Sequence, residues 1–380
     1  MNFPGRLGLQ QRVLPSYRAP FFDLLAGSCA GGLSLFAGQP RPQESIATTT
    51  SLRVAGYAAA RNLHLFDGAL YLCYQAGFLG WLADWNPDAL IVEANPRYLS
   101  TPSAVRWMKR RGRPVLGWGL GAPPPSGSPH FLGKSGESPP SGSSHFLGKW
   151  GEGKRGAFLN QFDGLIAYSQ RGADEYAALG FPRGKIFVAH NAVSPAPAVV
   201  PKPKPATFDG SPVILFVGRL QARKRVDALL RACAQMPNSP RLVIVGDGPE
   251  RGRLQQVAAQ VYPSAQFVGA KHGDELEPYF AEADLFVLPG TGGLAVQQAM
   301  SHGLPVIVAK GDGTQDDLVR AGNGWQIPPE DESALVSMLR EALSDARRLR
   351  KMGAESYRIV AQEINLEKMV DAFVRALNAV

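Results

Sequence analysis

The sequence predicts an α/β protein made of two Rossmann-like domains, each built on a parallel sheet. Its 380 residues are enough for two domains of ordinary size, and its hydrophobic fraction of 45% is that of a globular protein. Short apolar runs alternate with helical patterns in both halves, and a proline-rich stretch separates the halves. We therefore expect domains at 1–195 and 210–360, a linker at 196–209, and a closing helix at 361–380, for which we consider a crossing back to the first domain.

The N-terminal half carries the noisier of the two patterns. A weak strand at 7–9, continued by Val13, precedes a helix at 19–26. Stronger apolar runs then predict four further strands, at Ala89–Glu93, 115–118, 164–168 and 186–189. Strands that alternate with helices predict right-handed crossovers and therefore a parallel sheet.

A short internal duplication lies in the same half. The segment PPSGSPHFLGKSGE at 124–137 recurs as PPSGSSHFLGKWGE at 139–152. A repeat of this length is too short for a domain, and two copies are too few for a solenoid. We interpret it as a duplication within a mobile loop, about 122–154, without a function of its own. Its histidines, His130 and His145, lack a carboxylate or cysteine partner at ligand spacing, which disfavours a metal site there.

The C-terminal half has the clearer rhythm. Buried strands are predicted at Val213–Val217, 242–245, 265–268, Leu285–Leu288 and 305–308. Between the first two runs, an amphipathic helix is indicated by the spacing of Val226, Leu229, Leu230 and Cys233. The last helix is expected over roughly 355–380.

The net charge of +8 is unevenly distributed. Residues 1–200 contain 19 Lys and Arg against 11 Asp and Glu, whereas residues 201–380 contain 21 of each. A basic N-terminal half favours a phospholipid-like or polyanionic partner, while the lack of any recognition-helix or aromatic-basic motif disfavours nucleic acid. Three separated cysteines, no apolar run near 20 residues and no signal-peptide core predict a cytoplasmic protein, with peripheral membrane contact as a further expectation.

The segment FVGRLQARKRVD, 216–227, predicts an anion site. It reads as a strand end, a glycine turn and a helix start that carries Arg219 and Lys224, and two cations beside a helix N-terminus suit a diphosphate. A second strand-turn-helix unit, PGTGGLAVQQAM at 289–300, has a bare glycine entrance. Together the two turns predict a bound nucleotide diphosphate. The alternative is that the two cations form a solvated face.

Several ordered motifs resemble one enzyme family. VGRL with Lys224, VGDGPE, FVG, ADLFVLP, GGLAVQQAM and GLPVI occur in the order and spacing of the family 4 retaining glycosyltransferases. The resemblance is strong over 212–343 and weak in the N-terminal half, through YSQRGADEYAALGFPRGKIFVAHNAV. It implies the GT-B fold, in which two Rossmann-like domains have parallel sheets that face each other across a cleft. It also implies a nucleotide-sugar donor in the C-terminal domain and an acceptor in the N-terminal domain.

The resemblance also implies roles for single residues on the donor side. Arg219 and Lys224 would hold the donor diphosphate and stabilise the leaving charge without a metal or other cofactor. The chain contains no D-x-D triplet, and its acidic run at 330–332 is expected to open a helix at 333–343. The further donor-binding positions are Gly218, Gly246, Asp247, Phe267, Val268, His272, Thr291, Gly292, Gly293, Leu294, Ala295 and Gln298.

The chain departs from the family at two positions. Where members have two glutamates eight positions apart, it has Gly290 and Gln298. Glutamine can still form hydrogen bonds to ribose hydroxyls, whereas glycine has no side chain to reach the sugar. The identity of the donor sugar therefore stays open.

Acceptor candidates follow strands of the N-terminal half, where open α/β sheets bind ligands. Glu93 could deprotonate an acceptor hydroxyl or, equally, be the buried partner of an arginine. Trp118 could stack on a sugar or belong to the core. The remaining acceptor candidates are Tyr17, Arg18, Asn95, Arg97 and Tyr98.

The leading hypothesis is a metal-independent, retaining glycosyltransferase that moves a sugar from a UDP- or GDP-linked donor to a hydroxyl acceptor. A glycan or lipid-linked acceptor, in surface polysaccharide or glycolipid assembly, would suit the basic N-terminal half. The alternative is a non-catalytic nucleotide-sugar-binding protein, suggested by the missing glutamates. A dinucleotide-dependent oxidoreductase is disfavoured because no G-x-G-x-x-G follows the first strand.

Overall fold

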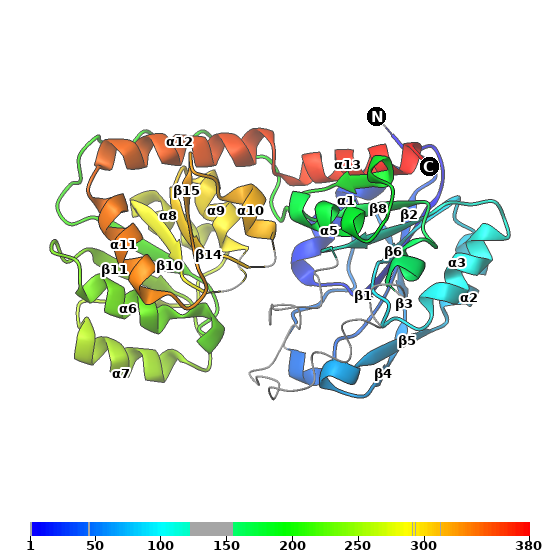
Figure 1. Cartoon of the computed structure of the whole chain (residues 1–380), viewed down its shortest axis with the longest axis horizontal. Coiled ribbons are helices and arrows are strands. Elements are labelled where there is room, and N and C mark those ends of the chain that lie inside the picture. The colour runs from blue at the N-terminus through cyan, green and yellow to red at the C-terminus, as the bar shows by residue number, and fades with distance from the viewer. Residues whose placement is uncertain (1, 45, 122–154, 291, 293, 312) are drawn as a thin grey trace. The chain divides into compact units, whose positions relative to one another are not determined.

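The computed structural model describes residues 2–44, 46–121, 155–290, 292, 294–311 and 313–380 (Figure 1). The duplicated segment, with His130 and His145, lies outside them, as do Thr291 and Gly293. The chain divides into two compact units. The first comprises Met1–Val193 together with Leu366–Val380, and the second comprises Ser194–Asn365.

The first unit is built on a seven-stranded parallel sheet. Its strand order is β3-β2-β1-β6-β7-β8-β9. The strand bounds are β1 Leu7–Val13, β2 Leu33–Gly38, β3 Gly56–Ala59, β6 Ala89–Glu93, β7 Val115–Gly119, β8 Gly164–Ala167 and β9 Ile186–Val188. Most of β1, β2, β6 and β8 is buried, as expected for parallel strands covered on both faces.

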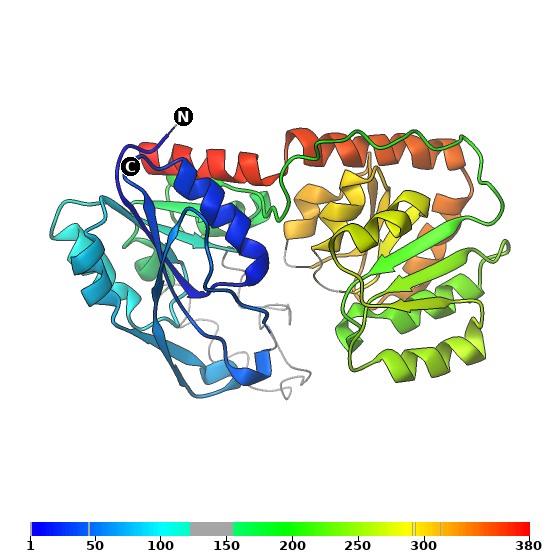
Figure 2. The ribbon, with the colours of Figure 1, turned by 180° about the vertical axis from the view of Figure 1, so that it is seen from behind.

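Helices cover both faces of this sheet (Figures 1 and 2). Side chains of α2, α3 and α5 belong to one core cluster on one face. On the other face, Phe21 of α1 and Phe373 of α13 meet Trp118 of β7. The helix bounds are α1 Ala19–Gly27, α2 Phe78–Trp85, α3 Thr101–Lys109, α5 Gln170–Ala178 and α13 Leu366–Asn378.

A separate antiparallel hairpin follows β3. It pairs β4 (Arg61–Leu65) with β5 (Leu72–Ala76). The sequence did not predict it, nor β2 and β3. The hairpin was not predicted because its sequence pattern is misleading. Leucines alternate with polar residues in β4, but the leucines face solvent.

The second unit has a six-stranded parallel sheet of order β12-β11-β10-β13-β14-β15. Its strands are β10 Val213–Val217, β11 Arg241–Val245, β12 Gln266–Gly269, β13 Leu285–Leu288, β14 Val306–Ala309 and β15 Gly324–Ile327. Its helices are α6 Val226–Ala234, α7 Arg251–Val261, α8 Glu277–Glu282, α9 Ala295–Ser301, α10 Thr314–Leu318, α11 Glu332–Leu343 and α12 Ala346–Gln362. The five expected strands are confirmed within a residue at each end, and β15 was not predicted.

Two expectations about helices near the C-terminus have opposite outcomes. The acidic run at 330–332 does open a helix, since the Asp331 carboxylate accepts a hydrogen bond from the Ala334 N–H at 2.9 Å at the start of α11. The single helix expected over 355–380 is wrong. The chain breaks after α12, where the Asn365 side chain donates to the Val360 carbonyl at 3.0 Å, and α13 continues on the first unit against α1, β8 and β9.

Across the described part of the chain, no helix combines the length and apolar character needed to cross a bilayer.

Candidate functional site

Each sheet has one place where its strand order reverses, and a candidate site lies at each. In the second unit, the reversal falls between β10 and β13. Open α/β sheets bind ligands at the carboxyl ends of the strands beside such a reversal. The loop 218–225 follows β10, and 289–294 follows β13.

The loops at this end nest closely because glycines permit it. A Cβ on Gly246, where φ is 146°, would lie 1.9 Å from the Gly218 carbonyl oxygen. A Cβ on Gly248, where φ is 158°, would lie 2.3 Å from the Leu220 carbonyl oxygen. The two glycines of VGDG therefore allow the loop after β11 to pack closely against the loop after β10. Asp247, between the two glycines, is exposed and accepts a hydrogen bond from Arg251 at 2.6 Å.

Basic side chains converge beside Gly292 at this end of the sheet. Lys224 is only 6% exposed, and its Nζ donates to the Gly292 carbonyl. A Cβ on Gly292 would lie 3.4 Å from Arg223 Nη1 and 3.9 Å from Lys224 Nζ. Burial, with the charge of Arg223, lowers the pKa of Lys224 to about 7. Burial, with the charge of Arg219, likewise lowers the pKa of Arg223.

The three side chains thus form one positive cluster, which we call the donor cluster: Arg219, Arg223 and Lys224. Arg219 is exposed, as a side chain at the mouth of a ligand site should be. Arg223 was missed by the sequence prediction. The signal available in the sequence was its place immediately before Lys224. In the structure both residues belong to the 3-10 turn Ala222–Lys224, and both side chains lie beside Gly292 in the loop after β13.

Gly290 is a structural necessity of this arrangement. A Cβ there would lie 2.1 Å from the Arg223 carbonyl oxygen and 2.5 Å from Lys224 Cα. The backbone of the cationic loop therefore occupies the space that any side chain at 290 would need. Glycine at this position leaves room for the backbone that carries Arg223 and Lys224.

The remaining donor candidates lie around the same sheet edge. Phe267 and Val268 are half-buried in β12, and His272 is exposed at the start of the 3-10 turn Gly273–Leu276. Leu294 is 42% exposed and Ala295 begins α9. The Gln298 side chain is half-buried on α9. Because α9 has only seven residues, its dipole is weak and the cations dominate the field.

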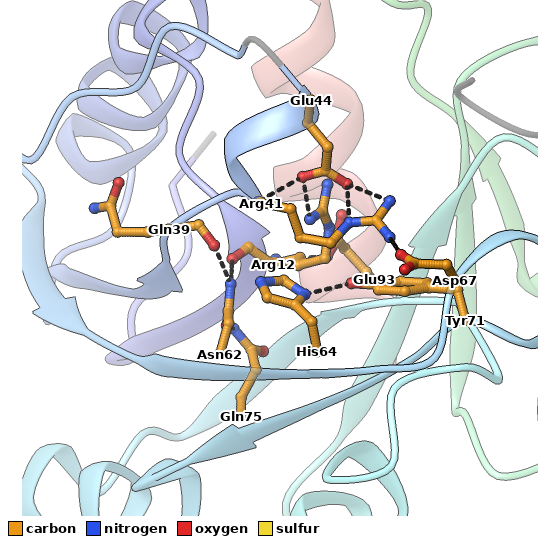
Figure 3. Close-up of polar contacts among 10 residues, drawn as sticks. All are labelled: Arg12, Gln39, Arg41, Glu44, Asn62, His64, Asp67, Tyr71, Gln75 and Glu93. Atoms are coloured by element: carbon orange, nitrogen blue, oxygen red, sulfur yellow. Dashed lines mark hydrogen bonds and ion pairs between the residues drawn. The ribbon is translucent and has the colours of Figure 1, made fainter. Parts of the chain in front are cut away.

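In the first unit, the reversal falls between β1 and β6, and it brings Arg12 and Glu93 together (Figure 3). Each is near the carboxyl end of its strand. The Glu93 Oε2 accepts a hydrogen bond from the Arg12 backbone N–H at 2.6 Å, and the Glu93 N–H donates to Gln10 Oε1 at 3.1 Å. Burial raises the pKa of Glu93 to about 7, against the opposing effects of Arg12 and the Tyr98 hydroxyl.

The Arg12 guanidinium has a different partner. Its Nη1 donates to Glu44 Oε2 at 2.8 Å, so Arg12 meets Glu93 through its backbone N–H. Burial favours a protonated Glu44, but the hydrogen bond and charge of Arg12 outweigh it and lower the pKa of Glu44. The pKa of the Glu93 carboxyl is therefore about 7, which suits this group to accept a proton at physiological pH.

The pair belongs to a wider ladder of charges and aromatic rings (Figure 3). Glu44 also binds Arg41, which pairs with Asp67 at 2.7 Å and lies 4.5 Å from the Tyr71 ring centre. The Tyr71 hydroxyl lies 2.9 Å from His64 Nδ1. The sequence did not indicate His64, Asp67 and Tyr71 because the hairpin that carries them was not recognised.

Two acceptor candidates require correction. Trp118 is 2% exposed and packs against Phe21, Phe373 and Tyr168, so it is a core residue and cannot stack on a sugar. Arg18 is also buried. Its Nη2 donates to Asn191 Oδ1 at 2.5 Å and its Nη1 to the Ala192 carbonyl at 3.2 Å, so it anchors the end of the first unit.

The other acceptor candidates differ in their exposure and in their contacts within the first unit. Tyr17 is 43% exposed and available to a ligand. Asn95 shapes the loop after β6, where its Oδ1 accepts the Arg97 N–H at 3.1 Å. The Arg97 carbonyl accepts the Cys73 N–H at 3.0 Å. Tyr98 is buried, with its hydroxyl beside Glu93, and so supports that carboxyl.

Comparison with known proteins finds a family match within the second unit. The model described as glycosyl transferases group 1 matches residues 211–345. A GDP-mannose-dependent alpha-mannosyltransferase of Mycobacterium tuberculosis is 42% identical over 123 residues, 32% of this chain and 31% of that protein. The lipopolysaccharide core biosynthesis glycosyltransferase LpsE of Rhizobium meliloti is 23% identical over 309 residues, 78% of this chain and 87% of that protein. The matches span 27–42% of the length of the first three curated relatives.

Solved structures extend the likeness to the whole chain. Anabaena Alr3699/HepE in complex with UDP has a TM-score of 0.69 at 16% identity, and the match covers 100% of both chains. The lipopolysaccharide outer core galactosyltransferase WaaB has a TM-score of 0.68 at 16% identity, with 98% and 99% covered. The chain therefore has the GT-B fold, and residues 211–345 of its second unit match the family model described as glycosyl transferases group 1.

Proposed function

We propose that this protein transfers a sugar from a nucleotide diphosphate donor to a hydroxyl acceptor with retention of configuration. The observation that carries the proposal is the donor cluster, three cations that converge at the strand reversal of a sheet within the glycosyltransferase group 1 match. A diphosphate is the ligand whose charge and size suit such a cluster at such an edge.

The chemistry follows from where charge develops. The bond between the anomeric carbon and the diphosphate oxygen breaks, and negative charge grows on the departing diphosphate. Arg219, Arg223 and Lys224 would stabilise that charge, which would lower the barrier without a metal ion. With retention, the acceptor hydroxyl attacks from the leaving-group side, so its proton can pass to the diphosphate.

Only the similar proteins limit which nucleotide base and which sugar we propose for the donor. One relative is GDP-mannose-dependent, and one structural neighbour holds UDP. Both bases belong to the proposal. Because the backbone at Arg223 excludes a side chain at 290, the sugar would be held by other groups than a glutamate there.

The acceptor would be a glycan or a lipid-linked saccharide, in surface polysaccharide or glycolipid assembly. The site at Glu93 supports this part of the proposal. Its carboxyl and the charged ladder around it offer the hydrogen-bonding groups that sugar hydroxyls require, and its near-neutral pKa suits proton transfer.

The test is donor turnover by the full chain with GDP- and UDP-sugars and a panel of saccharide acceptors. We expect turnover that persists in EDTA, a product with the donor's anomeric configuration, and a loss of about 100-fold or more in Lys224→Met. Lys351→Met, which changes an exposed lysine on α12, is the matched control and should retain wild-type rates. Nucleotide-sugar binding without turnover on any acceptor would instead indicate a non-catalytic binding protein.

A further inference from the structure

The β4–β5 hairpin has the reverse of the usual sidedness. Its inner face is polar: Asn62 lies opposite Gln75, and His64 lies opposite Cys73. Asn62 Nδ2 donates to the Arg12 carbonyl at 2.7 Å (Figure 3). Gln75 Nε2 donates to the Gln11 carbonyl at 3.0 Å. These contacts fix which face of the hairpin is turned toward β1.

The outer face is apolar. Leu63 pairs with Tyr74 and Leu65 with Leu72. The exposed fractions are 39% for Leu63, 42% for Leu65 and 44% for Tyr74. The neighbouring segment runs parallel to β5 through the Cys73–Tyr98 bridge, which sets Leu99, 43% exposed, beside Tyr74. Antiparallel sheets normally present polar side chains to water, so this hairpin outer face (Leu63, Leu65, Leu72, Tyr74 and Leu99) is shaped for a partner.

The turn of the hairpin also exposes apolar side chains. Phe66 is 67% exposed and has a φ of 58°, and Leu70 is 70% exposed. A bulky aromatic residue is disfavoured in the left-handed region, where glycine or asparagine fits without strain. A strained, exposed phenylalanine at a turn indicates that its ring has a use outside the folded unit.

Positive charge borders the apolar surface. Arg61 is exposed on the same face as Leu63, and Arg97 lies beside Leu72. The nearby acidic group of the turn, Asp67, is paired with Arg41 at 2.7 Å.

We propose that the hairpin outer face, with Phe66 and Leu70 at its turn, docks on an anionic phospholipid bilayer. Aromatic and leucine side chains enter the headgroup boundary, while arginines at the border meet anionic headgroups. A second copy of the chain fits less well, because a symmetric contact would bring the arginine borders of two copies together. The docking rests on the hairpin alone and does not depend on the reaction of the other unit.

The sharpest variant is Phe66→Asn. It removes the aromatic ring but places a residue that tolerates left-handed backbone at φ 58°, so the fold should be kept or stabilised. The matched control is Val199→Asn, an equally apolar-to-amide change at a residue that is 77% exposed in the other unit. Arg61→Gln tests the charged border separately.

The experiment is co-sedimentation of the full chain with sealed vesicles of phosphatidylcholine alone or with about one third phosphatidylglycerol. We expect wild type and Val199→Asn to bind the anionic vesicles, Phe66→Asn to bind about tenfold more weakly, and Arg61→Gln to lose part of its preference for the anionic lipid. Nucleotide-sugar binding should be the same in all four proteins. Wild-type binding by Phe66→Asn, or no vesicle binding by wild type, would overturn the proposal. Self-association that Phe66→Asn abolishes, without vesicle binding, would assign the face to a second copy.

Discussion

At the scale of the residue, the donor cluster depends on the lack of a side chain at Gly290. Gly290 lets the loop after β10 approach the loop after β13, and this approach brings Arg223 and Lys224 to Gly292. The sequence alone indicated Arg219 and Lys224 from their place after a buried strand. It could not indicate that the backbone of Arg223 and Lys224 fills the space beside Gly290, because that contact exists only in the folded unit.

Gly290→Ala should therefore destabilise the second unit. Its Cβ would lie 2.1 Å from the Arg223 carbonyl oxygen, and relieving such an overlap costs about 1–3 kcal/mol. Gly252→Ala on α7 is the matched control, since a Cβ there meets nothing within 4 Å and alanine favours a helix. Urea unfolding of the two variants makes the comparison. Equal stability of Gly290→Ala and wild type would show that the loop is not held as described.

Glu93 makes a prediction about pH. Its pKa is raised from 4.5 to about 7 in the folded protein, so folding favours the neutral carboxyl. That contribution is complete below pH 4.5 and is lost as the pH rises through about 7. Glu93→Gln stays neutral, so its melting temperature relative to wild type should increase between about pH 5 and about pH 8. A difference that does not change with pH would mean that Glu93 titrates normally.

At the scale of the element, apolar runs predicted the elements well and the C-terminal half best. Its five predicted strands are short, are bounded by glycine or proline and, except for β12, are mostly buried, so apolar runs identify them. The N-terminal half was less legible because its polar residues are inside: Gln10, Gln11 and Gln75 are buried in or beside β1. Alternation of polar and apolar residues cannot tell which face of a hairpin is turned to solvent, and β4 has its leucines outward.

The closing helix was foreseen but not its break or its binding surface. α13 is separate from α12 and buries Phe373 against Phe21 and Trp118, with ring centres 4.9 Å from each. The sequence shows that α13 is amphipathic, but a helix with one apolar face fits many surfaces. Its partner is set by aromatic residues more than 250 positions away along the chain.

Phe373→Ala should destabilise the first unit although Phe373 is near the end of the chain. Phe373 is fully buried, and such truncations cost about 3–5 kcal/mol. Arg375→Ala, on the exposed face of the same helix, should change stability by less than about 0.5 kcal/mol. Hydrogen exchange followed by mass spectrometry should show faster exchange in α1 and β7 for Phe373→Ala. Faster exchange confined to α12 would contradict the packing described for α13.

At the scale of the whole molecule, both candidate sites obey one rule, although the sequence foresaw them unequally. Each lies where the strand order of its own sheet reverses, between β10 and β13 or between β1 and β6. The residues of the candidate donor site sit in two short segments whose motifs are recognisable in the sequence. In the candidate acceptor site, Arg12, Glu44 and Glu93 come from three segments spread over about 80 residues, and only the fold brings them together.

The central claim, that the donor cluster binds the diphosphate of an activated sugar, is tested most directly by calorimetric titration of the full chain with UDP- and GDP-sugars. A nucleotide sugar keeps the charge of its diphosphate constant near neutral pH, so proton uptake on binding reports on the protein. Because the pKa of Lys224 is about 7, wild type should bind at least one donor, take up protons above that pH and lose affinity as pH rises. Lys224→Met should bind at least about tenfold more weakly at pH 7, without that proton uptake. Wild-type affinity in Lys224→Met would contradict the account.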